Sequence, residues 1–524
     1  MRLQLISMTI CLLLSGCAIV PEPLTVEELS DYVDDKQMRV TSDQESVNGP
    51  ISLYEAMARG LKYNLDHHVE LMEVSLRQRQ LRVAHFSMLP EVVANAGYND
   101  RDNYTGGRSV GLLGDTSTGT QSLRSSTSSE RDLRSSDLSF SWHILDFGLS
   151  HIRAQQSADQ TLIAEEQRRK VVNRIVEDVR TAYWKAVTAT RLVRRLAGLE
   201  NRVKQALKET QALSEDGQSS PLTALTYERE LVEIQRELRR LNAELSVAKA
   251  QLAALINIDP GKPFSVVVPR SQRPPAYVGM SAEQMVVKAL HSRSELREVA
   301  YNTRINNKEA EAALIEMLPG ISLQAAPNWN SNEFLFNNHW LSWGAKASWN
   351  LIKVFNYPAR RAVVRAKDDL LDQRALAVTM AIMTQVHVSR ARLIHARRKY
   401  SSARHYYSVQ SRILEQIKNS WSAGKVSEQT AIREEMNTLV ARVKLDLAFV
   451  ELQNAFANVY ASMGIDPYAE FMTGDESLGE LSTILRKGWR QLGDRHAALG
   501  LPHIPQSVLK MKRVALLVNR RKIT

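Results

Sequence analysis

The chain has 524 residues, of which 24% are charged and only 6% aromatic, and its formal net charge at pH 7 is +11. This length predicts more than one domain, and a sequence rich in Ala, Leu, Arg, Glu and Gln is typical of long helices and coiled coils. The chain has only two cysteines, which excludes a fold built on disulfides or on a cysteine-rich metal site.

The N-terminus has the layout of a secretory signal. Arg2 gives a positive start, residues 3–14 are mostly apolar, and two small residues precede Cys17. The apolar run is too short for a membrane-spanning helix with normal flanks. Its ending resembles a bacterial lipobox, which implies that residues 1–16 are removed and that Cys17 is lipidated. Because Ala18 rather than Asp follows, the resemblance also implies sorting to the outer membrane. An ordinary cleaved signal with an incidental cysteine is the alternative.

Export to the periplasm would also change how the cysteines and the net positive charge are interpreted. Cys11 would be removed with the signal, so the mature chain can form no internal disulfide, and its stability in an oxidising periplasm must come from packing. A basic chain can bind nucleic acid, but an exported one meets little of it. The arginine-rich runs at residues 191–195 and 390–404 fall in helical patterns. We interpret them mainly as solvated helix faces, with contacts to anionic lipid or a partner as the alternative.

The first segments of the mature chain predict a tether and a helix. Residues 17–50 are mostly polar and acidic, with three prolines, and would lead away from the lipid anchor. From Ser52 to Ser87 the apolar residues are spaced mostly by three, four or seven, which predicts one helix. Pro90 ends it, because the residue before a proline avoids helical backbone angles. A counterpart runs from Ser281 to Pro319.

Four segments predict strands by their alternation of apolar residues. They are residues 91–99, 137–145, 320–328 and 341–351. Each is about nine to eleven residues long, the length that a tilted strand needs to cross a bilayer. An open four-stranded sheet cannot lie in lipid, because the backbone groups at its edges would have no hydrogen-bond partners. The sheet must therefore close with other copies of the chain, which predicts a homo-oligomer.

Two pairs of long helices follow the strands. The expected bounds are residues 152–213 and 221–256 in the first pair, and 359–421 and 428–463 in the second. From Leu231 to Leu255 an apolar residue recurs every three or four positions, which predicts a coiled-coil seam. Gly217 and Gly424 lie between the helices of each pair, where a glycine eases the reversal of the chain.

The second half of the chain repeats the first. Met88-Leu89-Pro90 recurs 229 residues later, at 317–319, and Ile258-Asp259-Pro260 recurs 207 residues later, at 465–467. The difference of 22 residues (229 − 207) must lie between Pro90 and Trp142, most obviously in a longer loop at residues 105–136. A period near 207 is too long for a solenoid unit and predicts a duplicated domain.

The duplication sets the expected domain bounds. They are a first repeat at residues 51–260, a second at 280–467 and a C-terminal extension at 468–524. For the extension we keep two alternatives, a small packing piece at the middle of the molecule and a flexible tail.

The order of elements is helix, strand, strand, long helix, tip and long helix, twice over. With the Leu-Pro pairs before the strands, the glycines between the long helices and the repeated Ile-Asp-Pro, it resembles the TolC family of outer-membrane efflux ducts over residues 51–467. The resemblance implies a mainly α fold with membrane β: a homotrimer with a 12-stranded β-barrel, four strands per chain, and an α-helical barrel across the periplasm. It also implies a periplasmic adaptor protein and an inner-membrane pump as partners, in tripartite efflux or type I secretion of small molecules or proteins.

The same resemblance suggests candidate residues at the periplasmic tips. Gly217 and Gly424 are the tip glycines, and Trp421 matches an aromatic residue three positions before the second of them. The acidic residues that the family has six and nine positions after that glycine are Thr430 and Arg433 here. The basic residue two positions after it is replaced by a valine, with Lys425 beside it.

The acidic gate of the family is therefore not reproduced. A ring of like charges in a narrow pore sets the local potential, so we expect Arg433 at the entrance to favour anionic or neutral cargo. The alternative is that Arg433 lies on an outer face or pairs with Glu434 or Glu428 across neighbouring copies.

The sequence carries no convincing enzyme site, so we predict no catalytic residue, no cofactor and no metal site. The twelve histidines have no metal-ligand spacing, and the adjacent His67 and His68, expected at the surface, point to different faces of a helix. The alternative to a duct is a lipid-anchored periplasmic coiled-coil adaptor or structural protein that does not span the membrane. Four strands of membrane length favour the duct.

Overall fold

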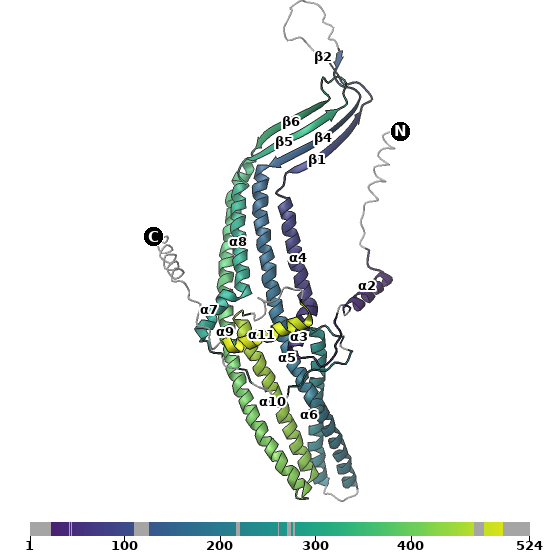
Figure 1. Cartoon of the computed structure of the whole chain (residues 1–524), viewed down its shortest axis with the longest axis vertical. Helices are drawn as coiled ribbons and strands as arrows, with labels where there is room; N and C mark the ends of the chain where they lie inside the picture. Colours follow the sequence, from purple (N-terminus) through teal and green to yellow (C-terminus); the bar gives the residue numbers. More distant parts are fainter. Residues whose placement is uncertain are drawn as a thin grey trace, which may run out of the picture.

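A computed structural model describes residues 22–40, 42, 44–108, 125–215, 221–259, 261–269, 274–275, 278–465 and 476–495. The molecule is elongated, with a four-stranded sheet at one end, two long helical hairpins at the other and short helices around the middle (Figure 1). Three predicted features lie outside the described residues: the signal segment, the lipidation site at Cys17 and the tip glycine Gly217.

Four helices lie side by side between the sheet and the middle of the molecule (Figure 1). In spatial order they are α4 (Leu65–Phe86), α5 (Ile144–Glu215), α8 (Ser294–Ile315) and α9 (Leu351–Ser422). Only α5 and α9 continue towards the far end, where α5 pairs with α6 (Pro221–Leu255) and α9 with α10 (Glu428–Ser462). At ~1.5 Å per residue, helices of 72 residues extend for about 108 Å, long enough to link both ends of the molecule.

Corresponding helices in the two halves have equal lengths. Helices α5 and α9 both have 72 residues, and α6 and α10 both have 35, each pair being 207 positions apart. Helices α3 (Leu53–Tyr63) and α7 (Ala282–Ser292) both have 11 residues and are 229 positions apart. The change of offset falls in the connection between the first two long strands, which contains the short strands β2 (Gly106–Arg108) and β3 (Ser125–Thr127).

The prediction of one continuous helix from Ser52 to Ser87 was wrong. The chain bends at Asn64, which has an extended backbone and separates α3 from α4. The Asn64 side chain accepts from two N–H groups of α4, and its Nδ2 donates to the carbonyl of Leu255 at 3.0 Å. Satisfying helix ends with a side chain in this way stabilises the bend.

The second half has the same bend at Arg293, between α7 and α8. Its guanidinium donates to the carbonyl of Ser462 at 3.4 Å, and Ser462 is the counterpart of Leu255, 207 residues later. Both halves therefore hold the end of the returning helix with the residue at the bend. Helices α5 and α9 also begin earlier than expected, and α9 contains Pro358.

The ends of α6 and α10 show how the duplicated halves have diverged. Each turns through a left-handed residue, Asn257 (φ 55°) in the first half and Gly464 (φ 66°) in the second. In both turns the next N–H bonds back into the helix, Ile258 to Ala253 and Ile465 to Tyr460. A Cβ on Gly464 would lie 2.9 Å from backbone atoms of Ser292, so only glycine fits there.

Residues flanking the two halves form two further helices. Helix α2 (Val26–Arg39) lies within the predicted tether and has no buried residue. Helix α11 (Leu478–Arg495) crosses the middle of the molecule and packs on α3 (Figure 1). It buries Leu478, Leu481 and Leu485 in the core of the first half. This part of the C-terminal extension is a packing piece, and residues 496–524 lie outside the described structure.

His67 is buried rather than at the surface, and its ring Nδ1 lies 2.7 Å from the carbonyl of Leu61. The expectation of a surface residue was wrong because the bend at Asn64 turns the start of α4 inward. Burial lowers the pKa of His67, and because a carbonyl oxygen only accepts, the ring Nδ1 donates this hydrogen bond. Among the helices that the structure describes, none is both long enough and apolar enough to cross a membrane.

Candidate functional site

The sheet is antiparallel and open at both edges. Its strands, in spatial order, are β1 (Glu91–Asp100), β4 (Asp132–His143), β5 (Gly320–Asn330) and β6 (His339–Ser348). All four predicted strands are present, and β4 begins five residues earlier than expected. Among the strands that the structure describes, none lies beside the outer backbone groups of β1 or β6.

The strand register separates the side chains into two faces of opposite character. One row across the sheet pairs Val92 with Phe140, Phe140 with Ala325, and Ala325 with Trp343. The next row on this face pairs Trp142 with Leu323. Trp343 is 84% exposed, although it is a large apolar side chain. We call this surface the apolar face of the sheet.

The opposite face is polar. Asn95 pairs with Asp137 and donates to it at 2.9 Å, and Asp137 pairs in turn with Asn328. Ser322 pairs with Lys346 on the same face. Val93 and Trp340 are apolar exceptions on this face. An exposed apolar patch of this extent marks an interaction surface, and alternation over strands of this length is typical of strands with one side towards lipid and the other towards water.

The sheet and the helix layer end at the same two edges. Helix α4 forms one edge, beside β1, and α9 forms the other, beside β6 (Figure 1). Both edge helices expose apolar rows. On α4 these are Leu65, Val69, Met72, Leu76, Val83 and Phe86, spaced by three, four or seven. On α9 they include Phe355, Val363, Leu370 and Met380. Each edge thus presents unpaired strand groups and an apolar helix row together.

At the opposite end of the molecule, the tip of the second hairpin is a tight helix-to-helix turn. Gly424 is left-handed (φ 69°), and its N–H donates to the carbonyl of Trp421 at 2.9 Å. Lys425 follows and donates its N–H to the carbonyl of Ser420 at 2.8 Å, which completes the helix cap. Thr430 lies in the first turn of α10 and hydrogen-bonds to the capping residue Ser427.

Trp421 and its neighbours are linked to the first hairpin by charge. The guanidinium of Arg202 on α5 lies 6.0 Å from the Trp421 ring centre. Arg202 also pairs with Glu435, and with Glu428 at 3.6 Å. Lys418 approaches Glu435 at 3.7 Å. These contacts join both helices of the second hairpin to α5.

Arg433 lies in a second link between the hairpins. Its guanidinium is 3.4 Å from a carboxylate oxygen of Glu230 on α6 and 4.0 Å from one of Glu434. The Arg433 side chain is 47% exposed. Within one chain the structure therefore places Arg433 beside Glu230 and Glu434, whereas Glu428 pairs with Arg202.

Further towards the middle, a buried carboxylate holds the hairpins together. Asp446 on α10 is fully buried and lies 3.0 Å from Arg191 on α5 and 3.3 Å from Arg442. Arg191 also donates to the carbonyl of Pro269 at 3.4 Å. Sequence reasoning found neither Asp446 nor Arg202. Arg202 has no counterpart in the second half, where residue 409 is Val, so the repeat gave no signal for it.

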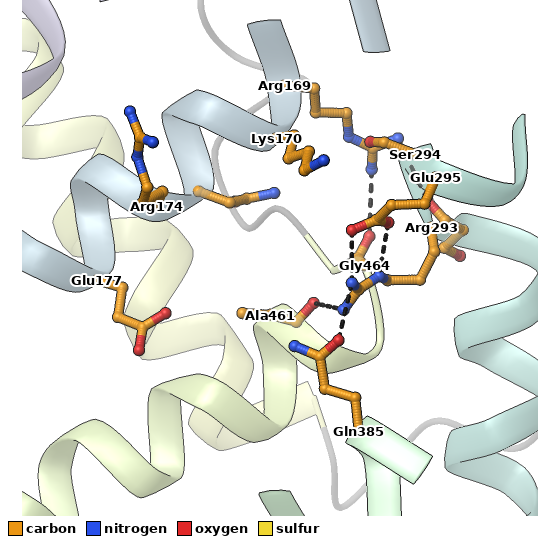
Figure 2. A pocket seen from close by; sticks show the side chains of 12 residues that line it. Arg169, Lys170, Arg174, Glu177, Arg293, Ser294, Glu295, Gln385, Ala461 and Gly464 are labelled. Atoms are coloured by element: carbon orange, nitrogen blue, oxygen red, sulfur yellow. Dashed lines mark hydrogen bonds and ion pairs between the residues drawn. The ribbon is translucent and has the colours of Figure 1, made fainter. Parts of the chain in front are cut away.

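A small cavity of ≈150 Å³ lies at the junction of α5, α8 and the end of α10 (Figure 2). Arg293 points between Glu295 and Gln385 and pairs with Glu295 at 2.6 Å. Burial alone would raise the pKa of Glu295, but the hydrogen bond and charge of Arg293 outweigh it, and the pKa is lowered. Arg169 donates to the carbonyl of Gly464 at 3.1 Å. Arg293, with Glu295 and Gln385, and Arg169, with the carbonyl of Gly464, thus hold the helices together at this junction.

Within the part of the chain that the structure describes, no group of three or more His, Cys, Asp or Glu side chains is placed to hold a metal ion. The described residues instead form an amphipathic sheet, two edges that each combine unpaired strand groups with an apolar helix row, and two hairpins joined by ion pairs.

The comparisons with known proteins agree with this geometry. Residues 68–257 match the family model of the outer membrane efflux protein. No curated protein matches the chain. Among solved structures, it is similar to a membrane protein from Pseudomonas aeruginosa, with 17% identity and a TM-score of 0.63, over 81% of this chain and 92% of that one.

Two further solved structures are similar over most of their length. The Campylobacter jejuni CmeC outer membrane channel has 15% identity and a TM-score of 0.61, over 90% of this chain and 98% of that one. The outer membrane protein VceC from Vibrio cholerae has 12% identity and a TM-score of 0.57, over 79% and 96%. The prediction of a mainly α, TolC-like fold is confirmed: residues 68–257 match the outer membrane efflux protein model, and the chain has the fold of the outer-membrane channels to which it is similar.

Proposed function

We propose that this protein is an outer-membrane exit duct that passes small molecules or proteins from the periplasm to the exterior, in a tripartite efflux or type I secretion system. The observation that carries the proposal is the apolar face of the sheet. Its strands have the length and alternation that a bilayer requires, and no part of the chain that the structure describes covers them. The likeness to CmeC, which is an outer membrane channel, supports the same conclusion.

The open edges imply a closed homo-oligomer. In lipid, the unpaired groups of β1 and β6 need partners, and another copy of the chain can supply them. The α4 edge and the α9 edge are different surfaces, so joining one to the other is a head-to-tail contact that generates a ring when the rotation closes. We propose a homotrimer, in which three sheets form a 12-stranded β-barrel and the long helices continue it as an α-helical barrel into the periplasm.

The alternative is a lipid-anchored periplasmic adaptor or structural protein that does not span the membrane. Such a protein can use long coiled-coil hairpins, but it would not need an exposed apolar sheet face. The apolar face therefore favours the duct. In this proposal Cys17 is the lipid attachment site, residues 51–260 and 280–467 are the two repeats, and the hairpin tips at Gly217 and Gly424 face a periplasmic adaptor and an inner-membrane pump.

The size of the oligomer tests the proposal directly. We expect the protein purified from outer membranes in detergent to have the mass of a lipidated trimer by native mass spectrometry. The trimer should also resist mild heating in detergent, because edge pairing buries backbone groups of every copy. A peripheral monomer released by salt or alkali would contradict the proposal of a duct and favour the adaptor alternative.

Arg433 provides a test of the entrance. We propose that it lies at the narrow periplasmic end, where Glu230 and Glu434 partly balance its charge. Changing Arg433→Asp reverses the charge in every copy and places it beside these two carboxylates. Single-channel recordings in a lipid bilayer should then show a preference for cations over anions that is several-fold higher than in the unmodified protein.

The variant Arg433→Gln serves as the matched control, because it breaks the contact with Glu230 without adding a negative charge. A smaller shift in the same direction is expected for it. If Arg433→Asp leaves the ion selectivity unchanged, Arg433 does not line the entrance.

A further inference from the structure

Helix α2 is amphipathic, yet the described part of its own chain leaves it uncovered. Its apolar residues Val26, Leu29 and Val33 follow the spacing i, i+3, i+7 and lie on one face. All three are exposed, Val26 by 87%. The other face is acidic, with five carboxylates in 14 residues against one Lys and one Arg. A capping box at Thr25 nevertheless starts the helix firmly.

The charge of α2 indicates what can cover it. Helices that lie on anionic lipid surfaces are rich in Lys and Arg on their polar face. Helix α2 is acidic, so such a surface would repel it. A basic, apolar protein surface is complementary to it, and a chain with a net charge of +11 can supply one.

Such a surface exists on the second half, at the middle of the molecule. A pocket of ≈480 Å³ lies beside α7 and α9, with a floor formed by Met280, Met285, Leu393 and Ile394. Its rim consists of Arg390, Arg397 and Arg398. Among the described residues, neither Arg390 nor Arg398 forms an ion pair, although Glu283 on α7 is near enough to interact with the charge of Arg390. We call this the equatorial pocket.

The position of α2 prevents it from reaching the equatorial pocket of its own chain. The carbonyl of Val40, just after α2, accepts a hydrogen bond from Asn257 at 2.8 Å, and Arg59 donates to the carbonyl of Glu45 at 2.9 Å. These contacts fix the end of α2 to the first half. Figure 1 shows α2 projecting from one side of the molecule, while α7 lies on the opposite side near the same level.

Closure of the ring would bring the two surfaces together. In the proposed trimer, the α4 edge of one copy meets the α9 edge of the next, so α2 projects from the first half towards the second half of its neighbour. We infer that α2 docks in the equatorial pocket of the adjacent copy. Its apolar face covers Met280 and Ile394, and its carboxylates pair with Arg390 and Arg398. This inference rests on the proposed trimer.

Cysteine cross-linking tests this contact, because the mature chain has no cysteine besides Cys17. The variant Val33→Cys/Ile394→Cys joins the apolar face of α2 to the pocket floor. The control Asp31→Cys/Ile394→Cys places the first thiol on the opposite face of α2, about 160° away. Each full-length variant is oxidised mildly in outer membranes and run on a denaturing gel without reductant, and native mass spectrometry counts the copies in a parallel unoxidised sample.

We expect dimers and trimers linked by disulfides in the Val33→Cys variant, at a yield at least five-fold above the control. Adding Glu27→Lys and Asp34→Lys should lower this yield several-fold, and Arg398→Glu with Arg390→Glu should recover part of it. The docking is overturned if a trimer forms without cross-links, if the bond forms within one chain, or if the control reacts equally. A monomer in the unoxidised sample would instead overturn the trimer itself, and the docking with it.

Discussion

Replacing Leu138 with Arg should prevent the protein from assembling in the outer membrane. Leu138 lies near the centre of β4, pairs with Ala94 on the apolar face of the sheet and is 48% exposed. An Arg facing lipid at the middle of the bilayer costs about 2–4 kcal/mol, and a trimer incurs that cost in each of its copies. We expect the heat-resistant oligomer to fall at least ten-fold in outer-membrane fractions.

The adjacent residue supplies the control. Ser139 pairs with Val93 on the opposite, polar face, where an Arg would meet water in the proposed lumen. Ser139→Arg should assemble at close to the normal level, although its longer side chain narrows the pore. Equal assembly of the two variants would mean that the apolar face does not contact lipid. The proposal of a duct would then lose its main supporting observation.

The second large effect is expected at Asp446. Changing Asp446→Ala leaves Arg191 and Arg442 without the carboxylate that they share in a buried site. Removing one partner of a buried ion pair costs about 3–5 kcal/mol, because the remaining charge is desolvated and unpaired. We expect a clear drop in the melting temperature of the purified protein, measured by calorimetry, and easier separation of the two hairpins.

Glu451 on the same helix is the matched comparison. It pairs with Lys399 at 2.5 Å, but both side chains are more than half exposed. An exposed pair contributes about 0–1 kcal/mol, so Glu451→Ala should shift the melting temperature little. Replacing Arg191→Met in the Asp446→Ala background should recover part of the lost stability. If Asp446→Ala melts like Glu451→Ala, the buried site does not hold the hairpins together.

The fold was largely predictable because its signals are local and repeated. Apolar spacing located the long helices, alternation located the strands, and recurring motifs gave the two offsets. The bend at Asn64 was missed because its cause is not local. Asn64 is held by the carbonyl of Leu255, which lies far away in the sequence and belongs to another helix. Helical spacing continues through the bend, so periodicity alone does not reveal it.

The candidate site was less predictable for the same reason. The resemblance pointed to Trp421, Gly424 and Arg433 on one hairpin. The residues that hold this hairpin, Arg202 and Glu230, belong to the other hairpin. One Arg or Glu on a charged helix face looks like many others in a sequence, and only the packing of α5 and α6 against α10 selects the ones that pair.

The turns that end α6 and α10 limit how this gene can evolve. Asn257 and Gly464 descend from one ancestral position, but each has since acquired a separate role. The Asn257 side chain holds the segment that carries α2, and Gly464 leaves room for the backbone of Ser292. Putting Asn at position 464 alone would place a side chain where no Cβ fits, and putting Gly at position 257 would release the N-terminal segment. The two turns have therefore become specialised, and neither residue can take the place of the other.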